Sequence, residues 1–392
     1  MPGLKTFMLI AGEPSGDLLA SELVLALREF WPDAKFIGAG GPKMEEAGVE
    51  LAFDMSDYAI VGIPTPGKWL ALRYLSGQLL ALAAERKPDA VIGVDYGGFN
   101  LRFGRAIKNY ARANPRAGWD PKLVQFVSPQ VWASRPGRAN QLASDYNLLL
   151  SIFPFEKEWY AKRAPKLRVE FVGHPMVDRL REAKIGSPQP RVRGPEPEEA
   201  TRKTPGGPMI LLLPASRKTE LKHHLPVMLG ALKLILEKFP SAGVKMILPN
   251  QELKQLASNA RSGLQIQVGN LREALEYADL AITKTGTVTM ECAFFGVPAV
   301  TMYKKPLLGV AIALGIVTVK SLTMPNLMAG EEVYPEFIQS AATPANIARA
   351  AVDLLQNQSR RQTLQSQLAR IIGSLGEAGA SRRAAAAISS LF

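Results

Sequence analysis

The stretch from Ala278 to Lys304 carries residue types that could bind a phosphorylated ligand. An apolar run of strand length is followed by a turn of small residues, and then by a helical pattern that ends at Gly296. A helix N-terminus offers unpaired N–H groups and a positive dipole end to an anion. Thr287 and Glu291 are four residues apart and share one helix face, which suits a diphosphate and its ribose. An ordinary strand-to-helix turn has the same pattern, so the rest of the chain must decide.

The same order of apolar strand, polar loop and amphipathic helix recurs along the chain. Thr6 to Ala11 leads into the loop 12–17, Ala90 to Val94 leads into the loop 95–100, and the pattern restarts at Met209. Parallel strands with helices on both faces bind ligands at the carboxyl ends of the strands. The sequence therefore predicts an α/β fold of two doubly wound, Rossmann-like domains that face a cleft, with the ligand between them.

The length of 392 residues also favours two domains. A segment with six prolines and little apolar content separates the two runs of strands, and it reads as a linker or insertion. We predict an N-terminal domain, a Pro-rich linker, a second domain and C-terminal helices, over residues 1–183, 184–208, 209–342 and 343–392, respectively.

Composition narrows the class of protein. One cysteine and three histidines exclude a disulfide framework, disfavour a structural zinc site and fit a reducing cytosol. The formal charge of +12 indicates anionic partners, but no RNP pattern, zinc finger or basic helix with heptads accompanies it. We therefore expect an anionic membrane surface or phosphorylated ligands, and no nucleic acid.

Several familiar enzyme motifs are missing from the sequence. We find no GxGxxG after the first strand, no GxxxxGK[ST], no GxSxG and no HExxH. Group transfer from a diphosphate-linked donor is the class of reaction that remains.

Seven segments in register resemble the lipid-A-disaccharide synthase family. They occur in the family's order and are spread along most of the chain outside the linker and the extreme C-terminus. They are AGEPSGD (11–17), FVSPQVWASR (126–135), PFEKEWY (154–160), FVGHP (171–175), LLLPASRKTE (211–220), GTVTMECAFFGVPAVTMYK (286–304) and MPNLMAGEEVYPEFIQ (324–339).

The resemblance implies a GT-B glycosyltransferase whose first domain takes the acceptor and whose second domain takes the UDP-sugar. Such an enzyme joins UDP-2,3-diacylglucosamine to 2,3-diacylglucosamine 1-phosphate (lipid X). It inverts the anomeric centre, needs no metal or other cofactor, and releases UDP with the β-1,6 disaccharide 1-phosphate of lipid A biosynthesis. Both substrates are anionic amphiphiles, so a cytoplasmic protein, peripheral on the inner membrane, is implied. Members often form dimers through the C-terminal region, so a homodimer through the helical tail is one implied assembly.

The resemblance also implies roles for individual residues. Arg217 would stabilise the diphosphate as UDP leaves, although a surface arginine would look the same. Further substrate contacts in the second domain would come from Ser216, Thr285, Gly286, Thr287, Glu291, Asn326, Glu332 and Gln339. In the first domain they would come from Gly12, Ser15, Gly16, Asp17, Asn100 and Ser128. For Asn326, Glu332 and Gln339, a capping or packing role is the alternative. For Ser15 to Asp17, the alternative is N-capping of the following helix.

The acceptor hydroxyl needs a general base. Many family members carry an Asp at the position of Gly98, so this chain departs from the pattern there. Asp95, at the end of its strand, is our candidate base, with Glu13 second. Asp95 could instead cap the following turn. Glu331 replaces a usual Arg, which is a reversal of charge.

Two other functions stay open at this point. One is a different UDP-sugar enzyme of the GT-B type, against which the SPQVW and PNLMAG segments argue. The other is a non-catalytic relative that binds lipid or UDP-sugar, which the departures at Gly98 and Glu331 suggest.

Overall fold

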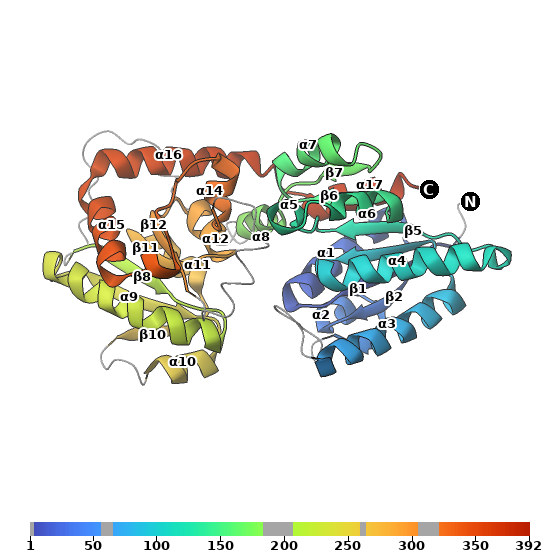
Figure 1. Ribbon diagram of the computed structural model, residues 1–392, viewed down its shortest axis with the longest axis horizontal. Coiled ribbons are helices and arrows are strands. Elements are labelled where there is room, and N and C mark those ends of the chain that lie inside the picture. The colour runs from blue at the N-terminus through green and yellow to red at the C-terminus, as the bar shows by residue number, and fades with distance from the viewer. Residues whose placement is uncertain (1–3, 56–65, 183–206, 259–263, 305–320) are drawn as a thin grey trace. The chain divides into compact units, whose positions relative to one another are not determined.

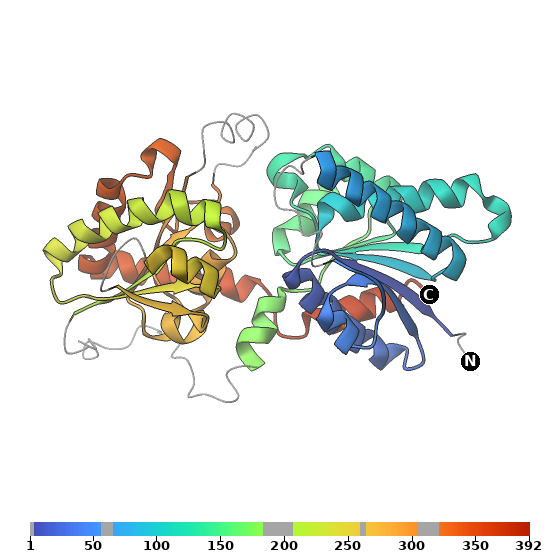
Figure 2. The same ribbon diagram turned by 90° about the horizontal axis from the view of Figure 1, so that it is seen from below.

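The computed structural model describes residues 4–55, 66–182, 207–258, 264–304 and 321–392. The chain divides into two compact units (Figures 1 and 2). Unit 1 comprises Met1–Ile185 with Leu375–Phe392, and unit 2 comprises Gly186–Ser374.

Unit 1 is built on seven parallel strands in the order β3-β2-β1-β4-β5-β6-β7. The central strands are mostly apolar because helices cover both faces. The strands are β1 (Thr6–Ala11), β2 (Lys35–Gly40), β3 (Glu50–Asp54), β4 (Ala90–Val94), β5 (Lys122–Phe126), β6 (Leu148–Ser151) and β7 (Val169–Phe171).

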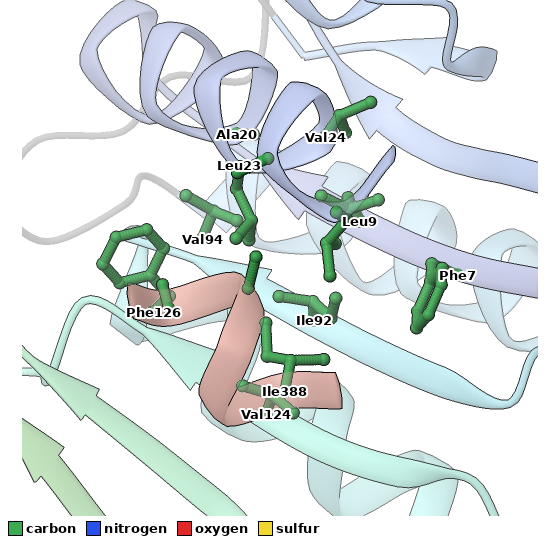
Figure 3. Packing of buried hydrophobic residues seen from close by; sticks show 14 of the residues in the cluster. Phe7, Leu9, Ala20, Leu23, Val24, Ile92, Val94, Val124, Phe126 and Ile388 are labelled. Carbon is green, nitrogen blue, oxygen red and sulfur yellow. The ribbon is translucent and has the colours of Figure 1, made fainter. Parts of the chain in front are cut away.

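The helices of unit 1 form two layers around this sheet. Leu9, Leu23 and Ile388 belong to one core cluster, so α1 and the C-terminal α17 cover the same face (Figure 3). Met8, Leu79 and Phe103 belong to the cluster on the other face, under α3 and α4. The helices are α1 (Pro14–Phe30), α2 (Pro42–Glu46), α3 (Pro66–Arg86), α4 (Gly97–Ala113), η2 (Pro115–Ala117), α5 (Val131–Ser134), α6 (Arg138–Asp145), α7 (Pro154–Arg163), α8 (Pro175–Glu182) and α17 (Ala380–Ser389).

Unit 2 repeats the same winding with six parallel strands, in the order β10-β9-β8-β11-β12-β13. Because strand–helix–strand connections are right-handed, helices that follow β8 and helices that follow β11 cover opposite faces. The strands are β8 (Met209–Leu213), β9 (Gly243–Leu248), β10 (Gln265–Val268), β11 (Leu280–Lys284), β12 (Ala299–Tyr303) and β13 (Glu336–Ile338). The helices are α9 (Lys218–Lys238), α10 (Gln251–Ser258), α11 (Leu271–Tyr277), α12 (Val288–Phe294), α14 (Met324–Ala329), η3 (Gln339–Ala341), α15 (Pro344–Gln356) and α16 (Gln358–Ser374).

The predicted fold class, α/β with two doubly wound sheets, is confirmed. The predicted helical tail 343–392 is divided: α15 packs on α9 in unit 2, whereas α17 packs on α1 in unit 1. Of the predicted linker 184–208, all but residues 207 and 208 lie outside the described residues. In the part of the chain that the structure describes, no helix is long and apolar enough to cross a bilayer.

Candidate functional site

Three loops of unit 1 meet at the point where the strand order reverses. Strands β1 and β4 are neighbours, with Ala11 opposite Val94, and the chain leaves them in opposite directions across the sheet. A Cβ atom added to Gly16 would lie 3.5 Å from the Asp95 Cβ, and one added to Gly97 would lie 2.9 Å from the Pro129 Cβ. The loops after β1, β4 and β5 therefore touch at this switch point, where open α/β sheets bind their ligands.

The backbone at Asp95 is held by two buried amides, which we call the amide clamp (Asn100 and Gln125). Asp95 and Tyr96 both adopt left-handed conformations, with φ of 51° and 41°. The Asn100 Nδ2 and the Gln125 Nε2 donate to the Asp95 carbonyl oxygen, at 3.0 Å and 2.9 Å. Because a non-glycine residue at positive φ is strained, the clamp supplies hydrogen bonds that hold it there. Asn100 thus fixes the loop from beneath, rather than offering its amide nitrogen to a ligand.

The Asp95 carboxyl is partly shielded from solvent at this switch point. The residue is half-buried, and burial raises the pKa of its carboxyl, while a hydrogen bond from the Tyr96 N–H partly opposes this. A carboxylate whose pKa is raised is a stronger base than an ordinary aspartate.

Glu13 and Gly12 lie beside the same loop. Glu13 is the N-cap residue of α1, and its charge raises the pKa of the Tyr96 hydroxyl after burial, whereas Arg102 lowers it. A Cβ atom added to Gly12 would lie 2.2 Å from the Tyr96 ring, so this glycine leaves room for the aromatic side chain. Glu13 therefore shares the electrostatic environment of the Asp95 loop.

The other predicted residues of unit 1 lie around this centre in different roles. Asp17 is buried and accepts hydrogen bonds from the backbone N–H groups of Gly41, Lys43 and Met44, so it orders the start of α2. Ser15 is exposed on the first turn of α1. Ser128 is buried, and its hydroxyl donates to the Tyr160 Oη at 3.3 Å.

A buried acid supports the loop after β5. The Trp132 Nε1 donates to the Glu156 Oε1 at 2.9 Å, and Glu156 is fully buried at the start of α7. Burial raises the pKa of Glu156 to about 7, against the opposing hydrogen bond from Trp132. Glu156 thus links the loop after β5 to the loop after β6 through a carboxyl that is mostly protonated below pH 7.

In unit 2, a charged cluster joins the loops after β8 and β11, again at the switch point. The Lys284 Nζ lies 2.9 Å from the Ser216 Oγ and 3.2 Å from the Glu220 Oε2. Glu220 also accepts from the Ser216 N–H, and Arg217 lies 3.8 Å from it. Burial raises the pKa of Glu220, but the Ser216 N–H and Lys284 outweigh it and hold the pKa below its ordinary value. Two cations thus share one ionised carboxylate at the N-terminus of α9.

The predicted phosphate-binding loop, residues 285–287, comes directly after Lys284 at the end of β11. Thr285 is buried and donates its N–H to the Met302 carbonyl, whereas Gly286 and Thr287 are exposed. Gly286 has a φ of 138°, which favours glycine, and a Cβ atom there would lie 3.4 Å from the Lys284 Nζ. Glu291 lies half-buried within α12, and burial raises its pKa. The helix α12 has only seven residues, so its N-terminus contributes only a partial positive charge. Lys284 and Arg217 each bring a full positive charge to this loop.

The three remaining predicted residues are separate from this cluster. Both amide atoms of the buried Asn326 are used on the backbone of Val333 and Tyr334. Glu332 is exposed, and Gln339 follows β13 at the edge of the sheet, with β12 between it and β11.

Comparison with known proteins identifies the family. Residues 7–390 match the model of the lipid-A-disaccharide synthetase family. The chain belongs to this family. It is 34% identical to the lipid-A-disaccharide synthase of Geobacter metallireducens over 97% of this chain and 96% of the relative. It is 33% identical to that of Solibacter usitatus over 99% and 98%. The predicted family, and with it a glycosyltransferase of lipid A biosynthesis, is confirmed.

Solved structures of the same fold are more distant in sequence. A UDP-GlcNAc 2-epimerase from Neisseria meningitidis bound to UDP-GlcNAc gives a TM-score of 0.61 at 13% identity, covering 99% of this chain and all of that one, 100%. Acinetobacter baumannii MurG gives 0.55 at 17% identity, covering 99% and 100%. These similarities confirm the predicted GT-B type of fold.

Sequence reasoning missed three polar residues at the two switch points. Gln125 was hidden inside an apolar strand, and Glu156 lay in a family segment without an assigned role. Lys284, the last residue of β11, was passed over in favour of the small residues after it. A polar residue within or at the end of a buried strand was the signal for Gln125 and Lys284.

Proposed function

We propose that the chain transfers the diacylglucosaminyl group of UDP-2,3-diacylglucosamine to the 6-hydroxyl of lipid X, with inversion. The observation that carries the proposal is Asp95, a partly buried carboxyl held at the switch point of unit 1, in a chain that matches the family over residues 7–390. The products are UDP and the β-1,6-linked disaccharide 1-phosphate.

Asp95 acts as the general base. The acceptor 6-oxygen attacks the anomeric carbon of the donor, and the bond from that carbon to the diphosphate oxygen breaks. The hydroxyl proton passes to the Asp95 carboxylate, and UDP leaves with the bonding electron pair. The amide clamp keeps the carboxylate in place, because a left-handed residue without those hydrogen bonds would relax. Glu13 is the second candidate for the base.

Unit 2 binds the donor. The charge that grows on the departing diphosphate is stabilised by Arg217 and Lys284 through charge-assisted hydrogen bonds. The exposed backbone of Gly286 and Thr287 lies next to the Lys284 ammonium group and contacts the phosphates. Glu291, one turn further, takes the ribose hydroxyls.

The proposal extends to where the protein works. Both substrates carry acyl chains and phosphate, and the chain carries a formal charge of +12. We place it on the cytoplasmic face of the inner membrane, attracted by anionic lipids. A homodimer through the C-terminal region belongs to the same proposal.

Turnover of UDP-diacylglucosamine and lipid X by the Asp95→Asn variant tests the mechanism. Asparagine tolerates left-handed backbone and matches the shape of aspartate, so the variant should fold and bind substrates. We expect kcat to fall by about 10²–10⁴. The control is Glu13→Gln, in which kcat should fall much less.

Three outcomes would contradict the proposal. If Glu13→Gln shows the larger loss, the two carboxylates exchange roles. A large gain in rate from Gly98→Asp, where a Cβ atom meets nothing within 4 Å, would mean that the base belongs at position 98. If the wild-type chain binds UDP but forms no disaccharide, it is a non-catalytic relative.

A further inference from the structure

Three arginines gather beside the Asp95 loop with no acidic partner among the described residues. Arg102 lies on α4, Arg135 follows α5, and Arg138 begins α6. None of their guanidinium groups takes part in an ion pair or a hydrogen bond within those residues. We call them the arginine cluster.

Backbone and side-chain hydrogen bonds bring the three arginines to one place: the Arg138 N–H donates to the Arg135 carbonyl oxygen at 3.0 Å, and the Gln141 Nε2 of α6 donates to the Leu101 carbonyl oxygen, next to Arg102, at 3.3 Å. The electrostatics of the half-buried Arg138 agree with this placement. Burial lowers its pKa, and the positive charges of Arg135 and Arg102 lower it further. Arg102 also acts on the Tyr96 hydroxyl, next to Asp95. The cluster therefore borders the switch point of unit 1, and its charges repel one another.

Other cations on the same surface are paired. Further along α4, the Arg105 Nε lies 3.0 Å from the buried Asp145, and the Lys108 Nζ lies 2.9 Å from Asp120. In α6, Asp145 is the last residue and Arg138 is the first. The helix dipole favours an acid at the first position and disfavours a cation there. The dipole of α6 thus disfavours a cation at Arg138 unless an anion is bound there, and Arg102 and Arg135 are exposed beside it.

We propose that Arg102, Arg135 and Arg138 bind a phosphate monoester, which in the proposed reaction is the 1-phosphate of the acceptor. Planar guanidinium groups match the oxygens of a dianionic phosphate, and each offers paired donors. The identity of the ligand rests on the proposed function, whereas the anion site does not. Binding the phosphate here fixes the acceptor next to the Asp95 loop.

Equilibrium binding to the full-length protein tests the site without turnover. The probes are glucosamine 1-phosphate and glucosamine, titrated by calorimetry at low ionic strength, because salt screens such contacts. The wild-type protein should bind the phosphorylated sugar at least about tenfold more tightly. Arg102→Gln and Arg138→Gln should each remove about tenfold of that affinity. The matched control is Arg112→Gln, which removes the same charge from an exposed position near the end of α4 and should leave the affinity within about twofold.

Kinetics separates a binding role from a structural one. In Arg102→Gln and Arg138→Gln, the KM for lipid X should rise while kcat and the KM for the donor stay unchanged. On an acceptor that lacks the 1-phosphate, these variants should equal the wild type. Equal losses on both acceptors, or equal losses in Arg112→Gln, would overturn the site.

An anionic lipid headgroup also offers phosphate oxygens to arginine, as a singly charged diester, so vesicles form a further arm. If the variants lose binding to phosphatidylglycerol vesicles but keep the wild-type KM in detergent, the cluster serves the membrane and the acceptor site is overturned. Failure of the proposed function would look different: glucosamine 1-phosphate would bind through these arginines, but no disaccharide would form.

Discussion

The two units wind their strands in the same order but hold the strand ends by different interactions. At the switch point of unit 1, neutral groups make the buried contacts: the amide clamp on Asp95, and the Trp132–Glu156 hydrogen bond. At the switch point of unit 2, Lys284 and Glu220 make a charged contact between two partly buried side chains.

The difference matches the task that the proposed function gives to each switch point. A general base gains strength when low-dielectric surroundings raise its pKa, and neutral hydrogen bonds fix its backbone without adding a charge that would lower it. A site for a diphosphate needs positive charge. In the free protein, the Glu220 carboxylate balances that charge until the anion binds. In the proposed reaction, one fold thus provides a base in unit 1 and an anion site in unit 2.

The largest expected effect comes from the buried acid of unit 1. The folded-state pKa of Glu156, about 7, exceeds its ordinary value of 4.5. Folding therefore favours the protonated form, and that stability is present below pH 4.5 and is lost as the pH rises through 7. Glu156→Gln keeps an acceptor for Trp132 without the charge. At pH 8 it should be more stable than the wild type by up to about 3 kcal/mol, a difference that disappears near pH 4.

Unit 1 can be followed alone in this experiment, because all five tryptophans lie within it. Denaturant unfolding is therefore read from tryptophan fluorescence at several pH values. Glu158→Gln is the control, since this exposed acid on the same helix pairs with Lys162. If Glu156→Gln and the wild type keep the same difference in stability at every pH, folding does not raise the pKa of Glu156, and unit 1 is not held by a neutral carboxyl at this position.

The charged cluster of unit 2 should show effects of opposite sign on the binding of UDP. Lys284→Met removes a cation, so the Kd for UDP should rise about tenfold, or about 1.4 kcal/mol. Glu220→Gln removes the competing anion but keeps an acceptor for the Ser216 N–H, so the Kd should fall by about threefold. Calorimetry with the full-length protein measures both.

Lys222→Met is the matched control for the cluster, because this lysine is exposed on α9. A purely structural ion pair would weaken UDP binding in Lys284→Met and Glu220→Gln alike. That result would remove the contrast between a neutral unit 1 and an anion-binding unit 2.

Most of the fold could be predicted from the sequence, and the strands that were missed lie at the edges of the two sheets. The apolar runs of β1, β4 and β8 were predicted with the observed bounds, because a strand covered on both faces contains little else. The edge strands β3 and β13 were not predicted, since each is short and mixes polar with apolar residues. The return of α17 to unit 1 depends on long-range packing that no local pattern encodes.

Only part of the candidate site could be predicted, because contacts between strands are not visible in the sequence. Residues in the loops after strands, such as Asp95 and Arg217, were found because loop position and residue type suffice. Gln125 and Lys284 act across neighbouring strands, so their partners appear only when the strand order is known. Asp17 and Asn100 were assigned to substrate, but their side chains hold backbone groups that the sequence does not reveal.

The smallest expected effects test the packing around the Asp95 loop with two neighbouring glycines. A Cβ atom at Gly97 would lie 2.9 Å from the Pro129 Cβ, whereas one at Gly98 meets nothing within 4 Å. Gly98→Ala should therefore stabilise unit 1 by about 0.5 kcal/mol, because alanine loses less entropy in the first turn of α4. Gly97→Ala should destabilise it by about 1 kcal/mol and lower kcat, because the loop after β5 has to move.

Fluorescence-detected unfolding compares the two variants, each of which adds one methyl group. Equal effects of Gly97→Ala and Gly98→Ala would mean that the loops after β4 and β5 are not in contact. The neutral contacts of unit 1 would then hold each loop separately, and the rigidity that the base needs would have to come from the amide clamp alone.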